Sequence, residues 1–264
     1  MLVRVLTALV LLSVFLAALL LLGQAWFSVL VGAVVALGAN EWARLTGWRG
    51  RMTLVYAAAC VLAWYAFLQL PALGEGLLLF SLLFWVLAVP AWLLRGWGTA
   101  APALAALAGL AVLVPAGVAL ATLPRGQLLL LLGLVWIADS AAYFAGRAFG
   151  RRKLAPTISP GKTWEGVAGA AAGCLIYAII CAMSVPSLRA QIAGAVWVPY
   201  LLGAAALCAI SVLGDLFESA VKRQAGAKDS GALLPGHGGV LDRIDAITAA
   251  LPLGALLLRQ LQPA

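Results

Sequence analysis

Acidic residues are distributed unevenly along this chain, and their spacing places several of them on common helical faces. Seven of the nine Asp and Glu residues follow position 138: Asp139, Glu165, Asp215, Glu218, Asp229, Asp242 and Asp245. At helical spacing, Asp215, Glu218 and Lys222 form one stripe. Asp242 and Asp245 lie three residues apart at the expected start of another helix. Mg2+ usually takes one or two carboxylates together with substrate phosphates. The pattern predicts a Mg2+ site with Asp215 and Asp242 as metal ligands, and it leaves a second metal ion open.

An acid inside an apolar stretch is a second indication of a site. Asp139 lies near the end of a predicted span, where a charge costs at least ~2.5 kcal/mol, so it normally faces a polar cavity and has a partner. Two other readings are an Asp139 that only locks helices together, and an Asp242–Asp245 pair that only stabilises a helix dipole, by under about 1 kcal/mol. Catalytic roles are predicted for the residues that these patterns select: Asp139, Glu218, Lys222 and Asp245.

Glycine and proline interrupt the segment between these acids and forbid a regular helix there: Gly231, Pro235, Gly236, Gly238 and Gly239. Such residues expose backbone N–H groups, as close approach to a phosphate requires. The chain's one histidine, His237, lies among them. It acts either as a general acid or phosphate donor, or as a brace for the loop. We retain it as a candidate catalytic residue.

Basic residues flank the acids and suit phosphate groups, whose charge a metal ion neutralises only in part. The substrate-binding candidates are Arg147, Lys162, Arg223, Lys228, Asp229 and Arg243. The run Gly161-Lys162-Thr163 is not a Walker A motif, because its first glycine would fall at Pro156 and no strand is expected before it. Lys162 remains a candidate phosphate ligand.

The elements that position these residues are predicted to be membrane-spanning helices. The chain is 65% hydrophobic and 10% charged, whereas soluble domains are about 45–50% apolar and about 25% charged. A span needs roughly 20 apolar residues, and nine stretches qualify: Leu2–Leu22, Ala25–Ala39, Thr53–Leu70, Leu77–Leu94, Ala101–Leu123, Gln127–Ala145, Val167–Val185, Val198–Phe217 and Ile244–Leu261. Eight spans with one long bent helix at the start is the alternative. The fold class is therefore all-α, a polytopic integral membrane protein forming one domain, 1–264.

Charge asymmetry predicts how the chain lies across the membrane. We assign 14 of the 17 Lys and Arg residues to the side that holds the 2–3, 4–5, 6–7 and 8–9 loops and the C-terminus. By the positive-inside rule this side is cytoplasmic, which puts the N-terminus in the periplasm and the C-terminus in the cytoplasm. Because topology explains the net charge of +8, we expect no nucleic-acid partner.

The second half of the chain resembles the phosphatidate cytidylyltransferases, also called CDP-diacylglycerol synthases. Their signature is similar to about 27 consecutive residues here, 219–245, which include Lys228-Asp229-Ser230-Gly231 and Leu241-Asp242-Arg243-Ile244-Asp245. The resemblance extends back through Gly214-Asp215, the run 159–166 and the segment 139–150. Residues 1–95 share only hydrophobic, multi-span character with the family, so we predict variable N-terminal spans over 1–95 and a catalytic region over 136–264.

The resemblance implies a membrane enzyme that makes CDP-diacylglycerol and pyrophosphate from CTP and phosphatidic acid, with a divalent metal. It implies that Asp215 and Asp242 hold the metal, and relatives suggest a homodimer. A multi-pass protein of the bacterial inner membrane, in contact with the lipid bilayer, is expected. The alternatives are a related CTP-using lipid enzyme, such as a polyprenol kinase or a CDP-archaeol synthase, and a transporter, for which intramembrane Asp139 is the usual pointer.

Overall fold

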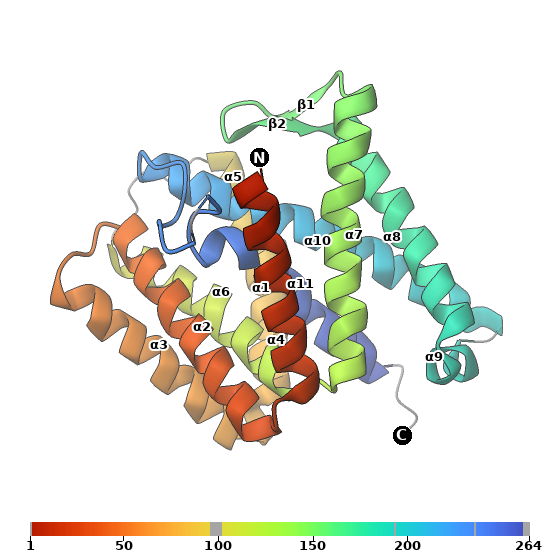
Figure 1. Ribbon diagram of the computed structural model, residues 1–264, viewed down its shortest axis with the longest axis horizontal. Coiled ribbons are helices and arrows are strands. Elements are labelled where there is room, and N and C mark those ends of the chain that lie inside the picture. Colours follow the sequence, from red (N-terminus) through yellow and green to blue (C-terminus); the bar gives the residue numbers. More distant parts are fainter. Residues whose placement is uncertain (1, 96–101, 193, 235, 261–264) are drawn as a thin grey trace.

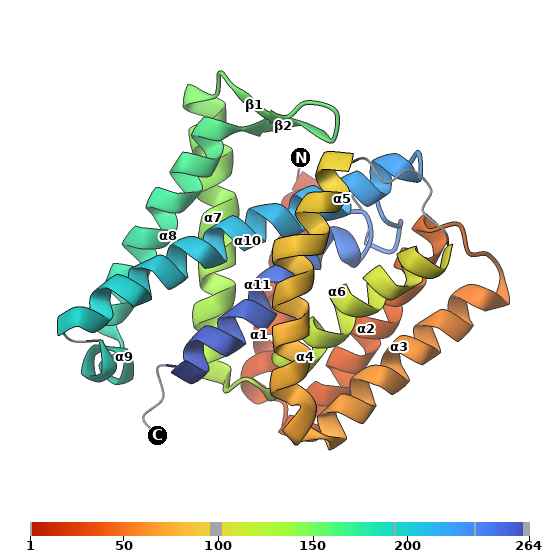
Figure 2. The same ribbon diagram turned by 180° about the vertical axis from the view of Figure 1, so that it is seen from behind.

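The computed structural model describes residues 2–95, 102–192, 194–234 and 236–260 as a bundle of tilted helices (Figures 1 and 2). The main helices are α1 (Leu2–Leu21), α2 (Gln24–Leu45), α3 (Arg51–Gln69), α6 (Pro102–Thr122), α7 (Arg125–Phe149), α8 (Trp164–Ser184), α10 (Trp197–Gln224) and α11 (Leu241–Gln260). Between α3 and α6, four short helical elements follow one another and form one rod: η1 (Pro71–Leu73), α4 (Gly74–Leu83), the π-helix η2 (Phe84–Ala88) and α5 (Val89–Arg95). Short helices α9 (Pro186–Gln191) and η3 (Gly194–Val196) connect α8 to α10.

Seven helices of the described chain are long and apolar enough to cross a membrane: Gln24–Leu45, Arg51–Gln69, Pro71–Arg95, Ala103–Thr122, Arg125–Phe149, Trp164–Ser184 and Gly194–Gln224. The remaining two predicted stretches correspond to α1 and to α11, which carries four charged residues. Helices α1 and α2 are separate and run in opposite directions (Figure 1). The prediction of an all-α polytopic membrane protein is confirmed, and one long bent helix at the start is not what the chain forms.

The two ends of the described chain lie at opposite ends of the bundle. The start of α1 lies at the end that carries the strands β1 and β2, and the last turn of α11 lies at the far end (Figures 1 and 2). Helix α11 starts at the end of the bundle that carries the strands and the charged loops between helices, called here the polar loops, and it crosses the bundle. It therefore ends on the side away from these loops. The predicted arrangement, in which the C-terminus shares a side with those loops, is therefore wrong.

The loop between α7 and α8 contains an antiparallel hairpin that was not predicted. Strands β1 (Lys153–Ala155) and β2 (Ser159–Thr163) pair with Lys153 opposite Thr163. Glu165 in the first turn of α8 accepts the backbone N–H groups of Arg151 and Arg152, at 3.1 and 3.2 Å, which fixes the hairpin to the helix. A strand does precede Gly161, contrary to expectation, but residues 161–163 belong to β2 and form no phosphate loop.

Helices α10 and α11 approach each other closely at Gly214. A Cβ atom there would lie 2.7 Å from the backbone oxygen of Asp245 and 2.9 Å from the Cβ of Ala249. Glycine is required at this crossing because there is no room for a side chain. The approach places Asp215, the next residue, beside the first turns of α11.

The first half of the chain encloses the acid-bearing part of α10. Phe217 is 1% exposed, and its ring contacts four aromatic rings from α2 and from the α4–α5 rod, with centroids 5.5 to 6.0 Å apart: Trp42, Phe84, Trp85 and Trp92. These pairs are tilted or edge-to-face, the arrangement that aromatic rings prefer. Because Phe217 lies between Asp215 and Glu218, this packing holds the acidic stripe in place.

The position of the last turn of α11 predicts on which side of the membrane a C-terminal topology reporter will lie. If the polar loops face the cytoplasm, a reporter fused after Ala264 should lie in the periplasm, where alkaline phosphatase is active and green fluorescent protein exported by the general secretory route is dark. The same pair of reporters fused at 156–158, in the hairpin, should give the opposite pattern. Equal patterns at the two positions would contradict the fold.

Gly214→Ala tests the helix crossing. Overlap with the backbone of α11 should cost roughly 1–3 kcal/mol, measured as a lower melting temperature in detergent. Gly203→Ala is the matched control, because it lies on the same helix and its Cβ would meet Leu257 at an ordinary 3.4 Å. That variant should be neutral or slightly more stable, since Ala exceeds Gly in helix propensity. Equal melting temperatures for the two variants would refute the close crossing.

Candidate functional site

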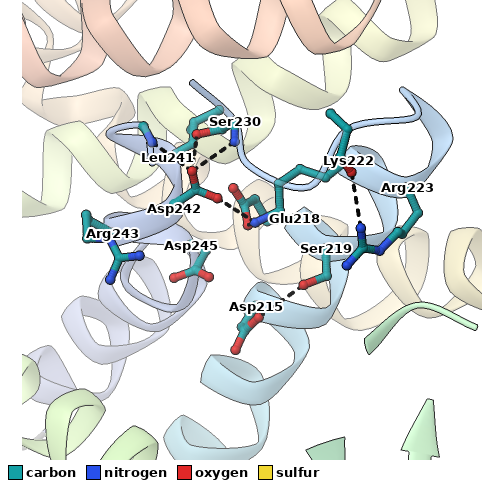
Figure 3. Close-up of polar contacts among 12 residues, drawn as sticks. Asp215, Glu218, Ser219, Lys222, Arg223, Ser230, Leu241, Asp242, Arg243 and Asp245 are labelled. Atoms are coloured by element: carbon teal, nitrogen blue, oxygen red, sulfur yellow. Dashed lines mark hydrogen bonds and ion pairs between the residues drawn. The ribbon is translucent and has the colours of Figure 1, made fainter. Parts of the chain in front are cut away.

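A buried lysine joins the acids of α10 to those of α11. The Nζ of Lys222 lies 2.5 Å from Oε2 of Glu218 and 2.6 Å from Oδ1 of Asp242 (Figure 3). The three side chains are only 12%, 5% and 6% exposed. The i, i+4 stripe predicted on α10 is therefore present, and its cation reaches across to the next helix.

Asp242 is surrounded by donors on both carboxylate oxygens. Beside the lysine on Oδ1, its Oδ2 accepts the backbone N–H and the hydroxyl of Ser230, at 2.8 and 2.9 Å, and the backbone N–H of Gly239 at 2.8 Å. Each carboxylate oxygen offers about two acceptor positions, so the three donors crowd Oδ2, whereas Oδ1 has one position beside the lysine for a further ligand. Asp242 thus holds the loop before α11 in place. This structural role is additional to the role of metal ligand that the sequence predicts for it.

Glu41, at the end of α2, belongs to the same cluster although the sequence analysis did not select it. Its side chain is buried, and it accepts the backbone N–H groups of Val240 and Leu241, at 3.0 and 2.9 Å. Its Oε2 also accepts the hydroxyl of Ser230 at 3.0 Å. One signal could have found it: Glu41 is one of only two acids in the first half and lies two residues after the end of a predicted span.

The glycines of the loop approach these carboxylates. A Cβ at Gly231 would lie 2.6 Å from Oε1 of Glu41, and one at Gly239 or Gly238 would overlap Glu41 or Asp242. Gly238 also has a φ of +78°, which favours glycine. The prediction that this loop exposes its backbone N–H groups to phosphate is wrong for residues 230 and 239–241. Their N–H groups bind protein carboxylates instead.

Asp215 faces a polar pocket. Its Oδ2 lies 2.6 Å from Nζ of Lys162, which reaches over from β2, and its Oδ1 accepts the hydroxyl of Ser219 at 3.3 Å. The pocket has a volume of about 630 Å³, and its charged lining residues are Asp139, Arg147, Lys162 and Asp215. The 161–163 backbone, the start of α8 and Val212 complete the wall. Two predicted acids and two predicted phosphate-binding cations thus share one cavity.

Asp245 lies next to this pocket on α11. In Figure 3 its carboxylate points toward Asp215, with Glu218 and Asp242 on the other side. Its Oδ1 accepts the N–H of Ala246 at 2.8 Å. Asp139 and Asp215 line the pocket, whereas Asp245 lies beside it and Glu218 is buried against Lys222. The catalytic roles of Asp139, Glu218 and Asp245 stay predictions.

Other predicted residues lie outside the pocket. Arg223 is exposed and donates to the backbone oxygens of Ile158 and Ala227, both at 3.3 Å, which ties α10 to the hairpin turn. Arg243 donates to the backbone oxygen of His237 at 3.1 Å. Lys228 and Asp229 are exposed in the loop. The structure assigns Arg223 and Arg243 bracing contacts, and the substrate roles of these four residues stay predictions.

His237 lies in the turn that precedes α11, and its backbone N–H donates to Leu234 at 2.8 Å. This contact, with that from Arg243, shows the histidine's backbone bracing the loop. The side chain is half-buried and does not line the pocket. Its role as a general acid or as a hydrogen-bond donor to phosphate stays a prediction.

The carboxylate oxygens of these acidic side chains suit a hard divalent cation as ligands. Glu218 is 4% exposed and its Oε1 has no hydrogen-bond partner, so a buried acceptor is left for a cation. The described residues contain no group of three His, Cys, Asp or Glu side chains already arranged as a metal site. That arrangement is compatible with Mg2+, which binds through one or two carboxylates and relies on substrate phosphates for others.

The fold and this cluster define a polytopic membrane protein with an acid- and lysine-lined pocket at one end of its helices. A model of the cytidylyltransferase family matches residues 2–261. The chain belongs to the cytidylyltransferase family. It is 46% identical over 266 residues to the phosphatidate cytidylyltransferase of Pseudomonas aeruginosa, covering 97% of this chain and 96% of the relative. It is 40% identical over 280 residues to that of Haemophilus influenzae, covering 94% and 95%. A Thermotoga maritima protein of the same name is 41% identical over 136 residues, 51% and 49% of the two chains.

The two lysines should differ in what they stabilise. Lys222→Met leaves two buried carboxylates without a cation, which should cost about 3–5 kcal/mol of unfolding free energy. Lys162→Met should cost about 0–1 kcal/mol, because its pair is 23% and 32% exposed. Melting temperatures in detergent measure both. Adding Glu218→Gln to Lys222→Met should recover part of the loss, and equal losses for the two single variants would contradict this assignment.

Proposed function

We propose that this protein transfers CMP from CTP to phosphatidic acid and releases pyrophosphate and CDP-diacylglycerol. The observation that carries the proposal is the pocket in which Lys162 and Arg147 face Asp215 and Asp139 at one end of a membrane-embedded bundle. The chain is a nucleotidyltransferase by family. A charged pocket beside lipid-facing helices suits a reaction between a water-soluble nucleotide and a lipid phosphate.

The chemistry needs positioning more than a strong base. Phosphatidate is already an anion at pH 7, so one of its phosphate oxygens attacks the α-phosphorus of CTP directly. The new oxygen–phosphorus bond forms as the bond from the α-phosphorus to the bridging oxygen breaks, and pyrophosphate leaves with that electron pair. Lys162 and Arg147 are placed to hold phosphate oxygens by charge-assisted hydrogen bonds.

We propose Asp215 and Asp242 as the Mg2+ ligands, with Glu218 and Asp245 beside them. The ion would neutralise charge on the triphosphate and on the leaving pyrophosphate. Each proposed ligand already has a lysine on one oxygen, Lys162 on Asp215 and Lys222 on Asp242. Lys162, which lines the pocket, is therefore placed beside the phosphates that would complete the metal site, while Lys222 compensates the buried acids.

We propose that the polar end faces the cytoplasm of a bacterial inner membrane, where CTP is available. The loops at that end hold most of the Lys and Arg residues. Placing the N-terminus on this side in place of the C-terminus still gives 14 Lys and Arg residues on this side and 3 on the other. The count does not change because each terminus carries one arginine, Arg4 and Arg259. In this orientation the N-terminus is cytoplasmic and the C-terminus periplasmic.

The activity is tested with purified protein in detergent, Mg2+, CTP labelled at the α-phosphate and phosphatidic acid. Label should appear in lipid and unlabelled pyrophosphate in solution, and EDTA should stop turnover until Mg2+ is restored. Asp215→Asn and Asp242→Asn should each lower turnover at least 100-fold with the protein still folded. Glu75→Gln, an exposed acid on α4, is the control and should leave turnover unchanged.

Other outcomes identify the alternatives. Transfer of label from the γ-phosphate to lipid would replace the proposal with a kinase. No metal-dependent turnover with any lipid phosphate would favour transport. Full activity in Asp242→Asn would restrict that residue to its loop contacts and remove it from the metal site.

A further inference from the structure

We propose that Glu41 is a positioning residue for CMP transfer, acting from the N-terminal half of the chain through Ser230 and Asp242. The inference rests on the proposed function, because Asp242 belongs to its metal site. Glu41 lies far outside the segment 219–245 that resembles the family signature, yet it contacts this segment at three points.

The carboxylate of Glu41 accepts hydrogen bonds from backbone N–H groups at the start of α11. The N–H groups of Val240 and Leu241 lie where a helix has no backbone acceptors of its own. Glu41 is 5% exposed and has no ion-pair partner within the described residues. Its negative charge is therefore balanced by backbone donors and by the positive end of the α11 dipole.

Ser230 connects this carboxylate to the site. Its hydroxyl lies 3.0 Å from Oε2 of Glu41 and 2.9 Å from Oδ2 of Asp242. A hydroxyl has a single proton, so the two carboxylates share one donor between them. The position of Glu41 thus influences both the orientation of Asp242 and the number of donors on its Oδ2.

Glu41 is held on a rigid part of the fold. Its neighbour Trp42 is 1% exposed, donates to the backbone oxygen of Ala105 at 2.8 Å and packs against Phe217. One turn earlier, a Cβ at Gly38 would lie 3.4 Å from the Leu241 side chain. The end of α2 is therefore fixed against α6, α10 and α11, and it provides a stable reference for the loop.

The glycines at 231 and 239 support the assignment from the opposite side. A side chain at either position would overlap Glu41. The loop is thus shaped around a carboxylate that comes from about 190 residues earlier in the chain. The contact requires this acid at this position, because a neutral side chain would supply neither the second acceptor oxygen nor the charge.

The test compares Glu41→Gln with Gly32→Ala. The control lies on the same helix, where a Cβ would press on the Trp64 ring at 2.9 Å, away from the loop. Glu41→Gln should lower kcat at least tenfold at saturating CTP and phosphatidic acid and raise the Mg2+ concentration for half-maximal rate at least threefold. Gly32→Ala should lower the melting temperature with kcat within twofold of the unmodified protein. Equal kcat values at matched loss of melting temperature would overturn the proposal.

A readout without turnover uses the loop itself. Lys228 is exposed two residues before Ser230, and Arg151 and Arg152 provide trypsin sites at the base of the hairpin, immediately before β1, as internal references. Glu41→Gln should speed cleavage after Lys228 at least fivefold relative to cleavage in the hairpin. An unchanged ratio would show that Glu41 does not hold the loop and would overturn the proposal.

Ser230→Ala covers the case in which Glu41→Gln does not fold. It removes the shared hydroxyl and keeps the backbone contacts of Glu41. It should raise the half-maximal Mg2+ concentration with a smaller loss of kcat, and no change in either would overturn the link through Ser230. An unmodified protein that fails to convert CTP and phosphatidic acid would refute the proposed function instead, while active unmodified protein with unaffected variants would refute only the role of Glu41.

Discussion

The arrangement of this protein depends on compensating negative charge that is buried where α10 meets α11. Lys222 lies between Glu218 and Asp242, and both carboxylate oxygens of Asp242 accept from donors of the protein. A buried charge without a partner is costly, whereas one whose donors are complete is tolerated and held in a single geometry. The loop before α11 brings donors to these carboxylates, and its glycines leave the room that the carboxylates need.

This requirement explains why the two halves of the chain form one unit. The acids proposed for the reaction are in the second half, but part of the surroundings that hold them comes from the first. Aromatic rings of α2 and the α4–α5 rod enclose Phe217, and Glu41 binds the start of α11. Variable N-terminal spans and a separate catalytic region are therefore an incomplete description, since the site is built by both.

The two lysines of the site, Lys222 and Lys162, differ in their surroundings and in their roles. Lys222 is buried and mainly compensates acids, while Lys162 is partly exposed in a pocket that Arg147 and Asp139 also line. The hairpin that carries Lys162 is fixed by Glu165 to the start of α8 and by Arg223 to the end of α10. A cation on a braced hairpin is held in one position, which suits a reaction such as nucleotidyl transfer that depends on positioning.

The sequence by itself determined the class of fold and selected most of the charged residues that the structure brings together. Composition and 20-residue apolar stretches predict spanning helices because lipid cannot satisfy backbone groups, and helical spacing predicts the Asp215–Glu218–Lys222 stripe because it depends only on local geometry. The pairing of Lys162 with Asp215, the hairpin, the position of the C-terminal end of α11 and the contact of Glu41 with Leu241 were decided by the tertiary structure. Each joins segments far apart in the chain, and their approach depends on how whole helices pack, which no local pattern of residues encodes.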